Sequence, residues 1–298
     1  MIDNLRKIYP SLIIYEEGIH DLDSSYKWFM TEENEIIGIY KSQLTPRDIS
    51  VLTAFLTPYD SEFPPLTEAE QKWRKAIDSN SSSETENVET TRPYRFVYFS
   101  IKKNQISPVL FKDAIHELFP EKVPILWENR HEGILIEHAN SLQDSIYYEE
   151  IIDVLMSDLY IKINFLVGPF KEETENVTDY YSFMIKAAKS IFSYSKKQVA
   201  NFSETVPYLL IDQTEKGQYL SIREMVLQGY ADDEETLRMI EVFTKCNLNI
   251  SETAKELHLH RNSLQYRLDR FTENTGIDIR KFHNAMAVYL ALLVKPQV

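Results

Sequence analysis

The sequence predicts an α+β protein in which a ferredoxin-like, palm-type middle domain is followed by an all-α helix-turn-helix bundle. Two observations support this prediction. Strand-like and helix-like segments alternate between residues 93 and 201 in the order β-α-β-β-α-β-α-β, as in a ferredoxin-like sheet. Residues 249–271 then contain two short amphipathic helical segments joined by a tight connection. The expected parts are residues 1–77, a small α+β regulatory region; 78–92, a linker; 93–205, the middle domain; 206–231, a connecting helix; and 232–298, the helix-turn-helix domain.

Length and composition indicate a soluble globular protein of about two domains. The chain has 298 residues, of which 43% are hydrophobic and 26% charged, the proportions of ordinary globular proteins. Its first seven residues lack the apolar stretch of a signal peptide, and the apolar run 285–294 is far shorter than the ~20 residues of a membrane span. The single cysteine, Cys246, excludes an internal disulfide framework and a multi-cysteine zinc site. We therefore expect a cytoplasmic protein without membrane contact.

The first region is expected to contain two short strands, at residues 11–16 and 35–40. A helix should open at Pro46, because proline suits the first helical turn. The apolar face of this helix would consist of Ile49, Leu52, Phe55 and Leu56. A second helix is expected after Pro65, where Thr67 and Glu70 have the spacing of a capping box.

The middle domain follows a polar segment. Residues 78–92 are rich in Ser, Asn, Thr and acidic residues and cannot bury apolar surface, so they are expected to be a linker. After it, strands are expected at residues 96–101, 123–128, 133–138, 162–167 and 198–201. Helices are expected at residues 108–119, 149–159 and 178–193. Residues 129–132 should form the turn of a hairpin between the second and third strands.

The bundle is expected to begin after a connecting segment that starts at residues 206–210. A helix at 219–228 would pack through Leu220, Met225 and Val226 and end at Gly229 in the left-handed conformation. Asp232 or Asp233 would cap the next helix, whose inward residues are Leu237, Ile240 and Phe243. The final helix, 280–294, would close the core with Ala287, Leu290, Ala291 and Val294.

The helix-turn-helix lies between these two helices. Asn249 and Glu252 have the spacing of a capping box at the start of its first helix, whose buried side would be Ile250, Ala254 and Leu257. The small Ala254 would let a second helix cross closely. The turn is expected at residues 258–260, with Leu259 as its apolar plug. The second helix, 261–271, would face inward with Leu264, Leu268 and Phe271.

The polar face of the second helix carries side chains of the types that can contact duplex DNA. Arginine pairs with guanine edges and Asn or Gln with adenine edges in the major groove, and the N-terminal residues of such a helix lie nearest the bases. The base-reading candidates are therefore Arg261, Asn262 and Gln265. The phosphate candidates are Tyr266, Arg267 and Arg270. A solvated polar face on a structural helix pair is the alternative interpretation, and helical periodicity alone does not separate the two.

The net charge of the chain bears on this prediction. A formal charge of −14 argues against a nucleic-acid partner, because a duplex repels an acidic body. Residues 258–271, however, contain three arginines and two histidines against a single acid, Asp269. We therefore expect weak non-specific binding and an affinity that depends on two recognition helices acting together.

These residues carry a family resemblance. Residues 249–271, with Ala254, Leu257 and the runs 260–264 and 266–268, resemble the C-terminal helix-turn-helix of the PucR/CdaR family of bacterial transcription regulators. The resemblance adds His260 and Ser263 to the DNA-binding candidates; family members usually carry Thr at Ser263 and Arg at Gln265. It also implies control by a small metabolite, and family members respond to purine breakdown products, sugar diacids or amino acids.

The order and place of the middle domain resemble the degenerate GGDEF-like domain of the CdaR subgroup. A diguanylate cyclase has two glycines and two acids at the hairpin turn, but this chain has Glu-Asn-Arg-His-Glu-Gly at residues 128–133. Two-metal phosphoryl chemistry therefore lacks its ligands. Phosphate-binding loops, His-Glu-x-x-His and Gly-x-Ser-x-Gly are also absent. His116, His131 and His138 match no metal-ligand spacing. We expect no enzyme activity, no metal and no cofactor.

The sequence thus predicts a metabolite-controlled transcription regulator that binds a palindromic operator in double-stranded DNA as a homodimer. Two alternatives remain open at this point. One is a nucleotide-binding signalling protein that uses residues 93–201. The other is a protein-interaction module that binds a partner chain and no DNA.

Overall fold

The computed structural model describes residues 1–15, 23, 25–31, 35–59, 63–78, 92–139, 147–174 and 176–293. The expected linker at 78–92 lies outside these residues except at its two ends. The chain divides into two compact units, the first formed by residues 1–186 and 197–202 and the second by 187–196 and 203–298. Among the described residues, no helix is long and apolar enough to cross a membrane.

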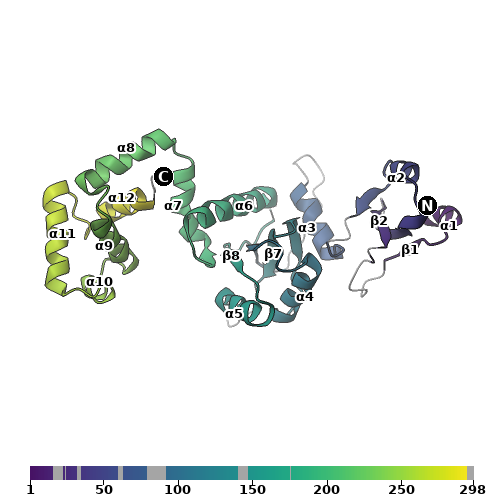
Figure 1. The fold of residues 1–298 in the computed structure, drawn as a ribbon, viewed down its shortest axis with the longest axis horizontal. Helices are drawn as coiled ribbons and strands as arrows, with labels where there is room; N and C mark the ends of the chain where they lie inside the picture. Colours follow the sequence, from purple (N-terminus) through teal and green to yellow (C-terminus); the bar gives the residue numbers. More distant parts are fainter. Residues whose placement is uncertain are drawn as a thin grey trace. The chain divides into compact units, whose positions relative to one another are not determined.

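A four-stranded antiparallel sheet organises the N-terminal region (Figure 1). Its strands are β1 (Ile13–Ile14), β2 (Tyr26–Met30), β3 (Ile36–Tyr40) and β4 (Thr57–Tyr59), in the order β1-β3-β2-β4. Its helices are α1 (Ile2–Ile8), the 3-10 turn η1 (Lys41–Gln43) and α2 (Pro46–Leu52). Phe29, Ile37 and Ile39 are fully buried and form its core with Leu52 and Leu56.

The middle sheet confirms the predicted order of elements. Its strands are β5 (Tyr94–Ile101), β6 (Ile125–Asn129), β7 (Glu132–His138), β8 (Ile163–Val167) and β9 (Val199–Asn201). They lie in the order β6-β7-β5-β8-β9, antiparallel except for the parallel pair β8 and β9. The connecting helices are α4 (Pro108–Leu118), α5 (Tyr148–Leu159) and α6 (Val177–Tyr194).

Both faces of this sheet are covered by helices, because β5 is apolar on both sides. Phe99 packs on one face with α4 and α5, in a core that includes Phe111 and Ile152. On the other face, Phe96 stacks on Tyr180 of α6 at a centroid distance of 4.7 Å. The same face receives Trp73 of α3 (Glu68–Asp78), whose ring centroid lies 5.8 Å from that of Phe96.

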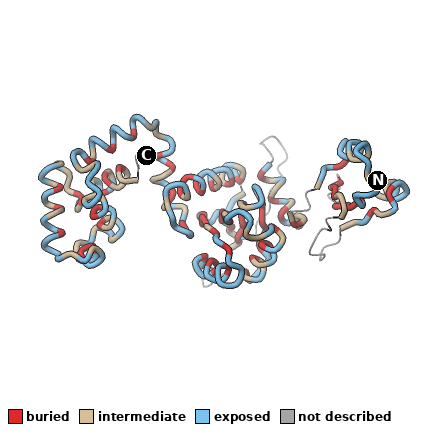
Figure 2. The backbone as a smooth tube through the Cα atoms, viewed as in Figure 1, coloured by how far each residue is buried: buried red, intermediate tan, exposed pale blue. Residues whose placement is uncertain are grey.

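The helical region contains α7 (Phe202–Asp212), α8 (Lys216–Leu227), the 3-10 turn η2 (Gln228–Tyr230), α9 (Glu234–Lys245), α10 (Ile250–Glu256), α11 (Arg261–Thr275) and α12 (Phe282–Leu293). The last four surround one apolar core, to which α8 and η2 add Leu227 and Tyr230. In Figure 2, buried positions lie on the inner sides of these helices and exposed positions on the outer sides. The protein is therefore α+β with a C-terminal helical region, as the sequence predicts.

Several details of the predicted packing are wrong. Phe55 is 70% exposed because α2 ends at Leu52. In α8, Leu220 and Met225 are exposed, and Tyr219, Arg223 and Leu227 are buried instead. The residue with a positive φ after α8 is Gln228 (φ 49°), whereas Gly229 lies within η2.

The inward face of α12 is also rotated relative to the prediction. Ala285, Val288 and Ala291 are its buried residues, while Ala287 and Leu290 are only partly buried. The fourth predicted core residue, Val294, lies outside the described residues. Because α12 is apolar on nearly every side, the sequence pattern does not select one face.

Candidate nucleic-acid interface

The first helix of the helix-turn-helix, α10, is fixed at its start by Asn249. The side-chain oxygen of Asn249 accepts hydrogen bonds from the N–H groups of Ser251 (2.9 Å) and Glu252 (3.2 Å), which satisfies amides that the helix leaves without partners. Ala254 is buried against the bundle core, and Ile250 and Leu257 pack at its edge. The predicted buried side of α10 is therefore confirmed.

The turn between α10 and α11 is tight. His258 has a φ of 53°, and the N–H of Leu259 donates to the carbonyl of Ala254 at 2.8 Å. The predicted plug is wrong, because Leu259 is only half-buried and does not join the bundle core. Leu248 and Leu257, which flank α10, pack there instead.

The second helix, α11, extends beyond the predicted 261–271. Its N-cap is His260, whose Nδ1 accepts a hydrogen bond from the N–H of Asn262 at 3.3 Å. Its C-cap is Gly276, in the left-handed conformation with a φ of 72°. Leu264, Leu268 and Phe271 are fully buried, as predicted. Their spacing turns the remaining side of the helix outward.

The outward side of α11 displays most of the predicted DNA-binding residues. Those that are exposed are His260, Arg261, Asn262, Ser263, Gln265, Tyr266 and Arg270. Tyr266 is 66% exposed, although an aromatic ring of this size usually buries much more of its surface in a folded protein. Asn262, Tyr266 and Arg270 follow one another at four-residue intervals and so form a row along the helix.

Arg267 differs from the other candidates. Its guanidinium forms an ion pair with Glu235 of α9, and its side chain is 39% exposed. The pair joins α11 to α9, so Arg267 has a structural contact within the bundle. Sequence spacing gave no sign of this pair, because Glu235 lies 32 residues earlier in the chain.

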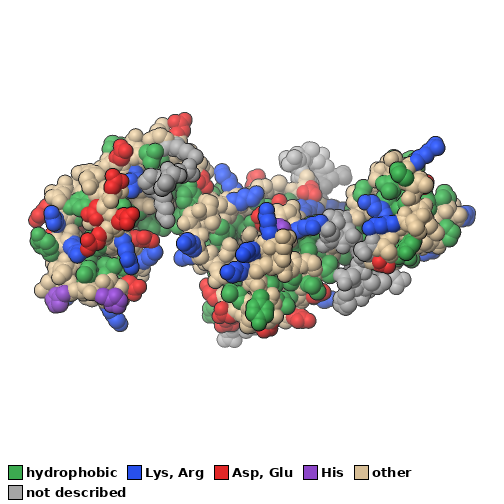
Figure 3. Space-filling view, viewed as in Figure 1, with side chains coloured by type: hydrophobic (Ala, Val, Ile, Leu, Met, Phe, Trp, Pro, Cys, Tyr) green, Lys and Arg blue, Asp and Glu red, His purple; other side chains and the backbone are tan. Residues whose placement is uncertain are grey.

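A second ion pair lies at the other side of α11. Arg280, in the turn between α11 and α12, donates from Nη1 to Oδ1 of Asp269 at 2.6 Å and from Nε to Oδ1 of Asp278 at 2.7 Å. These contacts raise the pKa of Arg280 and keep it charged. Figure 3 shows histidine side chains grouped with basic residues at the end of the bundle where α10 and α11 meet. The sequence analysis did not identify Arg280. The only indication of its ion pairs in the sequence is its position two residues after Asp278.

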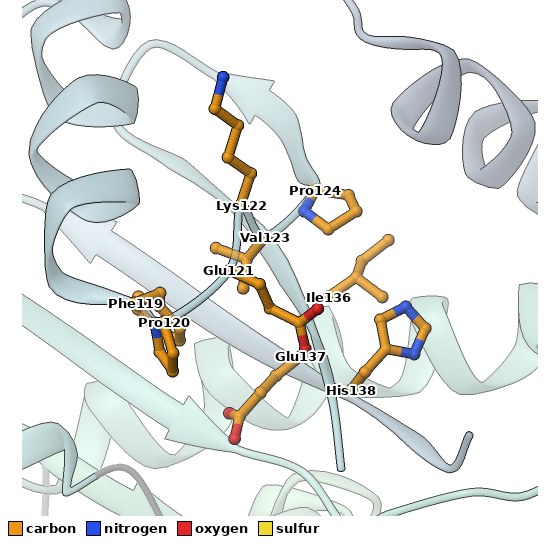
Figure 4. A pocket seen from close by; sticks show the side chains of 9 residues that line it. All are labelled: Phe119, Pro120, Glu121, Lys122, Val123, Pro124, Ile136, Glu137 and His138. Carbon is orange, nitrogen blue, oxygen red and sulfur yellow. The ribbon is translucent and has the colours of Figure 1, made fainter. Parts of the chain in front are cut away.

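One hollow of the middle domain lies beside the turn between α4 and β6. This cavity, lined by residues 119–124 and 136–138, has a volume of about 30 Å³ (Figure 4). On the same measure, one water molecule needs about 10–15 Å³, so the cavity has room for only a few waters. Burial lowers the pKa of His138 beside it, which favours a neutral ring. The cavity is therefore too small for a metabolite.

The end of β6, next to the hairpin turn, makes contacts within the protein. Oε1 of Glu128 accepts a hydrogen bond from the hydroxyl of Tyr181 at 2.6 Å and lies 3.8 Å from Nη1 of Arg74. Within the described part of the chain, no group of three or more His, Cys, Asp or Glu side chains is arranged to hold a metal ion.

Comparisons with known proteins agree with this geometry. Residues 236–294 match the family model described as "PucR C-terminal helix-turn-helix domain". The chain is 30% identical over 300 residues to the uncharacterized protein YxkF of Bacillus subtilis, covering 97% of each chain. It is 24% identical over 170 residues to the proline-responsive transcriptional activator PutR of B. subtilis, covering 53% of this chain and 38% of PutR. It is 38% identical over 55 residues to the carbohydrate diacid regulator of Escherichia coli, covering 18% and 14%.

Proposed function

Because the chain belongs to the PucR/CdaR family of transcription regulators, we propose that it binds double-stranded DNA sequence-specifically, with α11 in the major groove. The observation that carries this proposal is the exposed polar face of α11 on a helix whose other side is fully buried. A helix held in this way has the width and rigidity to enter a major groove of about 12 Å. A polar outer face is common on amphipathic helices, but the arginine, asparagine, glutamine and exposed tyrosine side chains on this one are types that contact bases and phosphates.

We assign the base contacts to the first turns of α11 and the phosphate contacts to its flanks. Arg261, Asn262 and Gln265 lie at the N-terminal end, where recognition helices approach bases. His260 and Ser263 flank them, and Tyr266 and Arg270 lie further along the row. Phosphate contacts fix the register of the helix, whereas base contacts supply specificity. Arg267 would contact DNA only after its ion pair with Glu235 is broken.

We propose that the protein acts as a homodimer on a palindromic operator. One recognition helix reads only a few base pairs, and two half-sites one helical turn apart, about 34–36 Å, double the sequence that is read. A symmetric operator would match the two-fold symmetry of such a dimer. The strongly acidic chain, with its charge of −14, would gain little affinity from general attraction to DNA.

Control by a small metabolite is the second part of the proposal. The middle domain would serve as the GGDEF-like signalling scaffold without enzyme activity, since the hairpin lacks the glycine pair and carries Glu128 in internal contacts. The metabolite would change DNA binding only if it binds two arrangements of the protein unequally. As a regulator of transcription, the protein would act in the cytoplasm, where bacterial DNA lies.

The decisive experiment is selection of bound duplexes from a random pool at fixed, moderate salt, followed by anisotropy titration of the winning duplex. A palindromic winner bound far more tightly than a scrambled duplex supports the proposal. No enrichment by folded protein, with or without a mixture of candidate metabolites, contradicts it. Heat-stability screens against nucleotides and a search for protein partners would then follow.

A further inference from the structure

The recognition helix carries two acidic residues on its outward side, Asp269 and Glu273, and Asp269 lies one turn nearer the N-terminal end that would approach the bases. Asp269 follows Gln265 by four residues, Tyr266 by three and Asn262 by seven, so it lies on the same face as these three DNA-binding candidates. Its side chain is 45% exposed. A free carboxylate at this position would face the phosphates that border the groove.

Such a carboxylate would weaken DNA binding. Like charges repel, and the groove focuses the negative potential of both strands. Coulomb repulsion between unit charges 4 Å apart amounts to about 1 kcal/mol in water and more near a protein surface. A counter-charge for Asp269, the acid nearer the base-reading end, would therefore favour entry of α11 into the groove.

Arg280 has the geometry of that counter-charge. Its Nη1 lies 2.6 Å from Oδ1 of Asp269, while its Nε holds Oδ1 of Asp278 at 2.7 Å. The backbone N–H of Arg280 also donates to Asp278, at 3.2 Å. The guanidinium is thus fixed from two sides, and its side chain is only 32% exposed. An arginine held in this way loses little conformational freedom when DNA binds.

We propose that Arg280, outside the recognition helix, is a positioning residue for DNA binding that acts by neutralising Asp269 on the DNA-facing side of α11. This inference rests on the proposed function, because it requires that α11 contacts a duplex. Arg280 is not required to touch DNA itself. Its partner in this role is Asp269, and removal of that acid should make the arginine dispensable for affinity.

A rescue experiment tests the inference. Full-length wild-type protein, Arg280→Met, Asp269→Asn and the double variant would be titrated against the selected duplex by anisotropy. Exposing the carboxylate of Asp269 in Arg280→Met should weaken binding roughly fivefold, since repulsion at this range is on the order of 1 kcal/mol. The double variant should bind within about twofold of Asp269→Asn. Lys281→Met, which removes a neighbouring exposed cation, is the matched control and should show no rescue by Asp269→Asn.

The possible results distinguish a failure of this inference from a failure of the proposed function. Unchanged binding by Arg280→Met overturns the inference, as does a loss that Asp269→Asn fails to rescue, because Arg280 would then contact DNA directly. Absence of duplex binding by the wild type would instead contradict the proposed function. If Arg280→Met does not fold, Arg280→Lys provides the second variant. A lysine reaches only one carboxylate at a time, so its binding loss should be smaller and should again disappear in the Asp269→Asn background.

Discussion

At the scale of single residues, position along α11 separates the two exposed arginines. Arg261 is the first residue of the helix, and Arg270 follows nine residues later. A rise of 1.5 Å per residue puts about 13 Å of helix axis between them. An approach through the N-terminal end of α11 would therefore bring Arg261 to base edges and Arg270 to the backbone.

This difference gives a prediction. Arg261→Ala should weaken binding to the selected duplex by about 1–3 kcal/mol and relax the preference at one base pair, as loss of a bidentate guanine contact does. The measurement is an anisotropy titration against the selected duplex and its single-base variants. Arg270→Ala is the matched control; it should weaken all sequences alike and reduce the salt slope by about one. An equal loss on every duplex for Arg261→Ala would assign that residue to the backbone.

At the scale of elements, the start of α9 depends on the charge of Asp233. The hydroxyl and the N–H of Thr236 donate to its carboxylate, at 2.8 and 3.1 Å, and lower its pKa below the ordinary 3.8. Because the pKa is lower in the folded state, the stabilisation is complete above the unfolded pKa. It is lost as the pH falls through the folded pKa.

Asp233→Ala should therefore lower the free energy of unfolding by about 1 kcal/mol at pH 7, the usual cost of losing an N-cap. The gap between wild type and variant should shrink below about pH 4. Thermal unfolding followed by far-ultraviolet circular dichroism at several pH values measures it. Asp233→Asn, which keeps a capping oxygen without titrating, should retain its stability. A gap that stays constant down to pH 3 would contradict the assignment.

The attachment of α3 gives another prediction, at Glu70. This carboxylate is fully buried and accepts hydrogen bonds from Nζ of Lys112 (2.7 Å) and the N–H of Ile125 (2.8 Å). Glu70→Ala leaves a buried cation unpaired and should cost about 3–5 kcal/mol. The tryptophans, at positions 28, 73 and 127, all lie in the first unit, so their fluorescence in urea reports its unfolding.

The control for Glu70 is the exposed pair of Glu68 and Lys72, whose Nζ and Oε1 lie 2.6 Å apart. Water screens such a pair, so Glu68→Ala should leave the urea midpoint unchanged. Adding Lys112→Met to Glu70→Ala should recover part of the lost stability, because the unpaired charge is then gone. Similar midpoints for Glu68→Ala and Glu70→Ala would show that the buried pair does not anchor α3.

The predictable elements share a physical cause. The strands and helices of the middle domain could be predicted to within a few residues because their apolar periodicity is strong and the hairpin has a polar turn. The helix α7 was predicted only as a connecting segment, since Pro207 within it is a usual helix breaker. The strand β2 was missed because it depends on pairing with both β3 and β4. The inward face of α12 could not be predicted, because apolar residues lie on nearly every side of that helix. The inward face of α8 could not be predicted, because its apolar residues are spread over more than one side and a charged residue, Arg223, is buried among them.

The candidate interface was also predictable only where local sequence spacing determines it. The exposed face of α11 follows directly from the spacing of Leu264, Leu268 and Phe271. The ion pairs of Arg267 and Arg280 depend on how α9 and the turn after α11 fold back onto the helix. No local pattern encodes that approach.

At the scale of the whole molecule, charge and symmetry must act together. A chain of charge −14 is repelled by DNA at long range. A single α11 would supply only a few phosphate contacts to offset this repulsion. Two copies on one operator would add their contacts while the cost of bringing protein and DNA together is met once. We therefore expect specific binding to depend steeply on the distance between half-sites.

Operator spacing tests this expectation. Inserting about five base pairs between the half-sites of the selected duplex turns them to opposite sides of the helix, because one turn takes about 10–10.5 base pairs. Affinity should fall to that of a single half-site, and an insertion of ten should restore part of it. Anisotropy titrations give the affinities, and sedimentation velocity gives the number of chains on each duplex. Equal affinity at every spacing, with one chain bound, would mean that a single protomer reads the operator and that the dimer has no part in recognition.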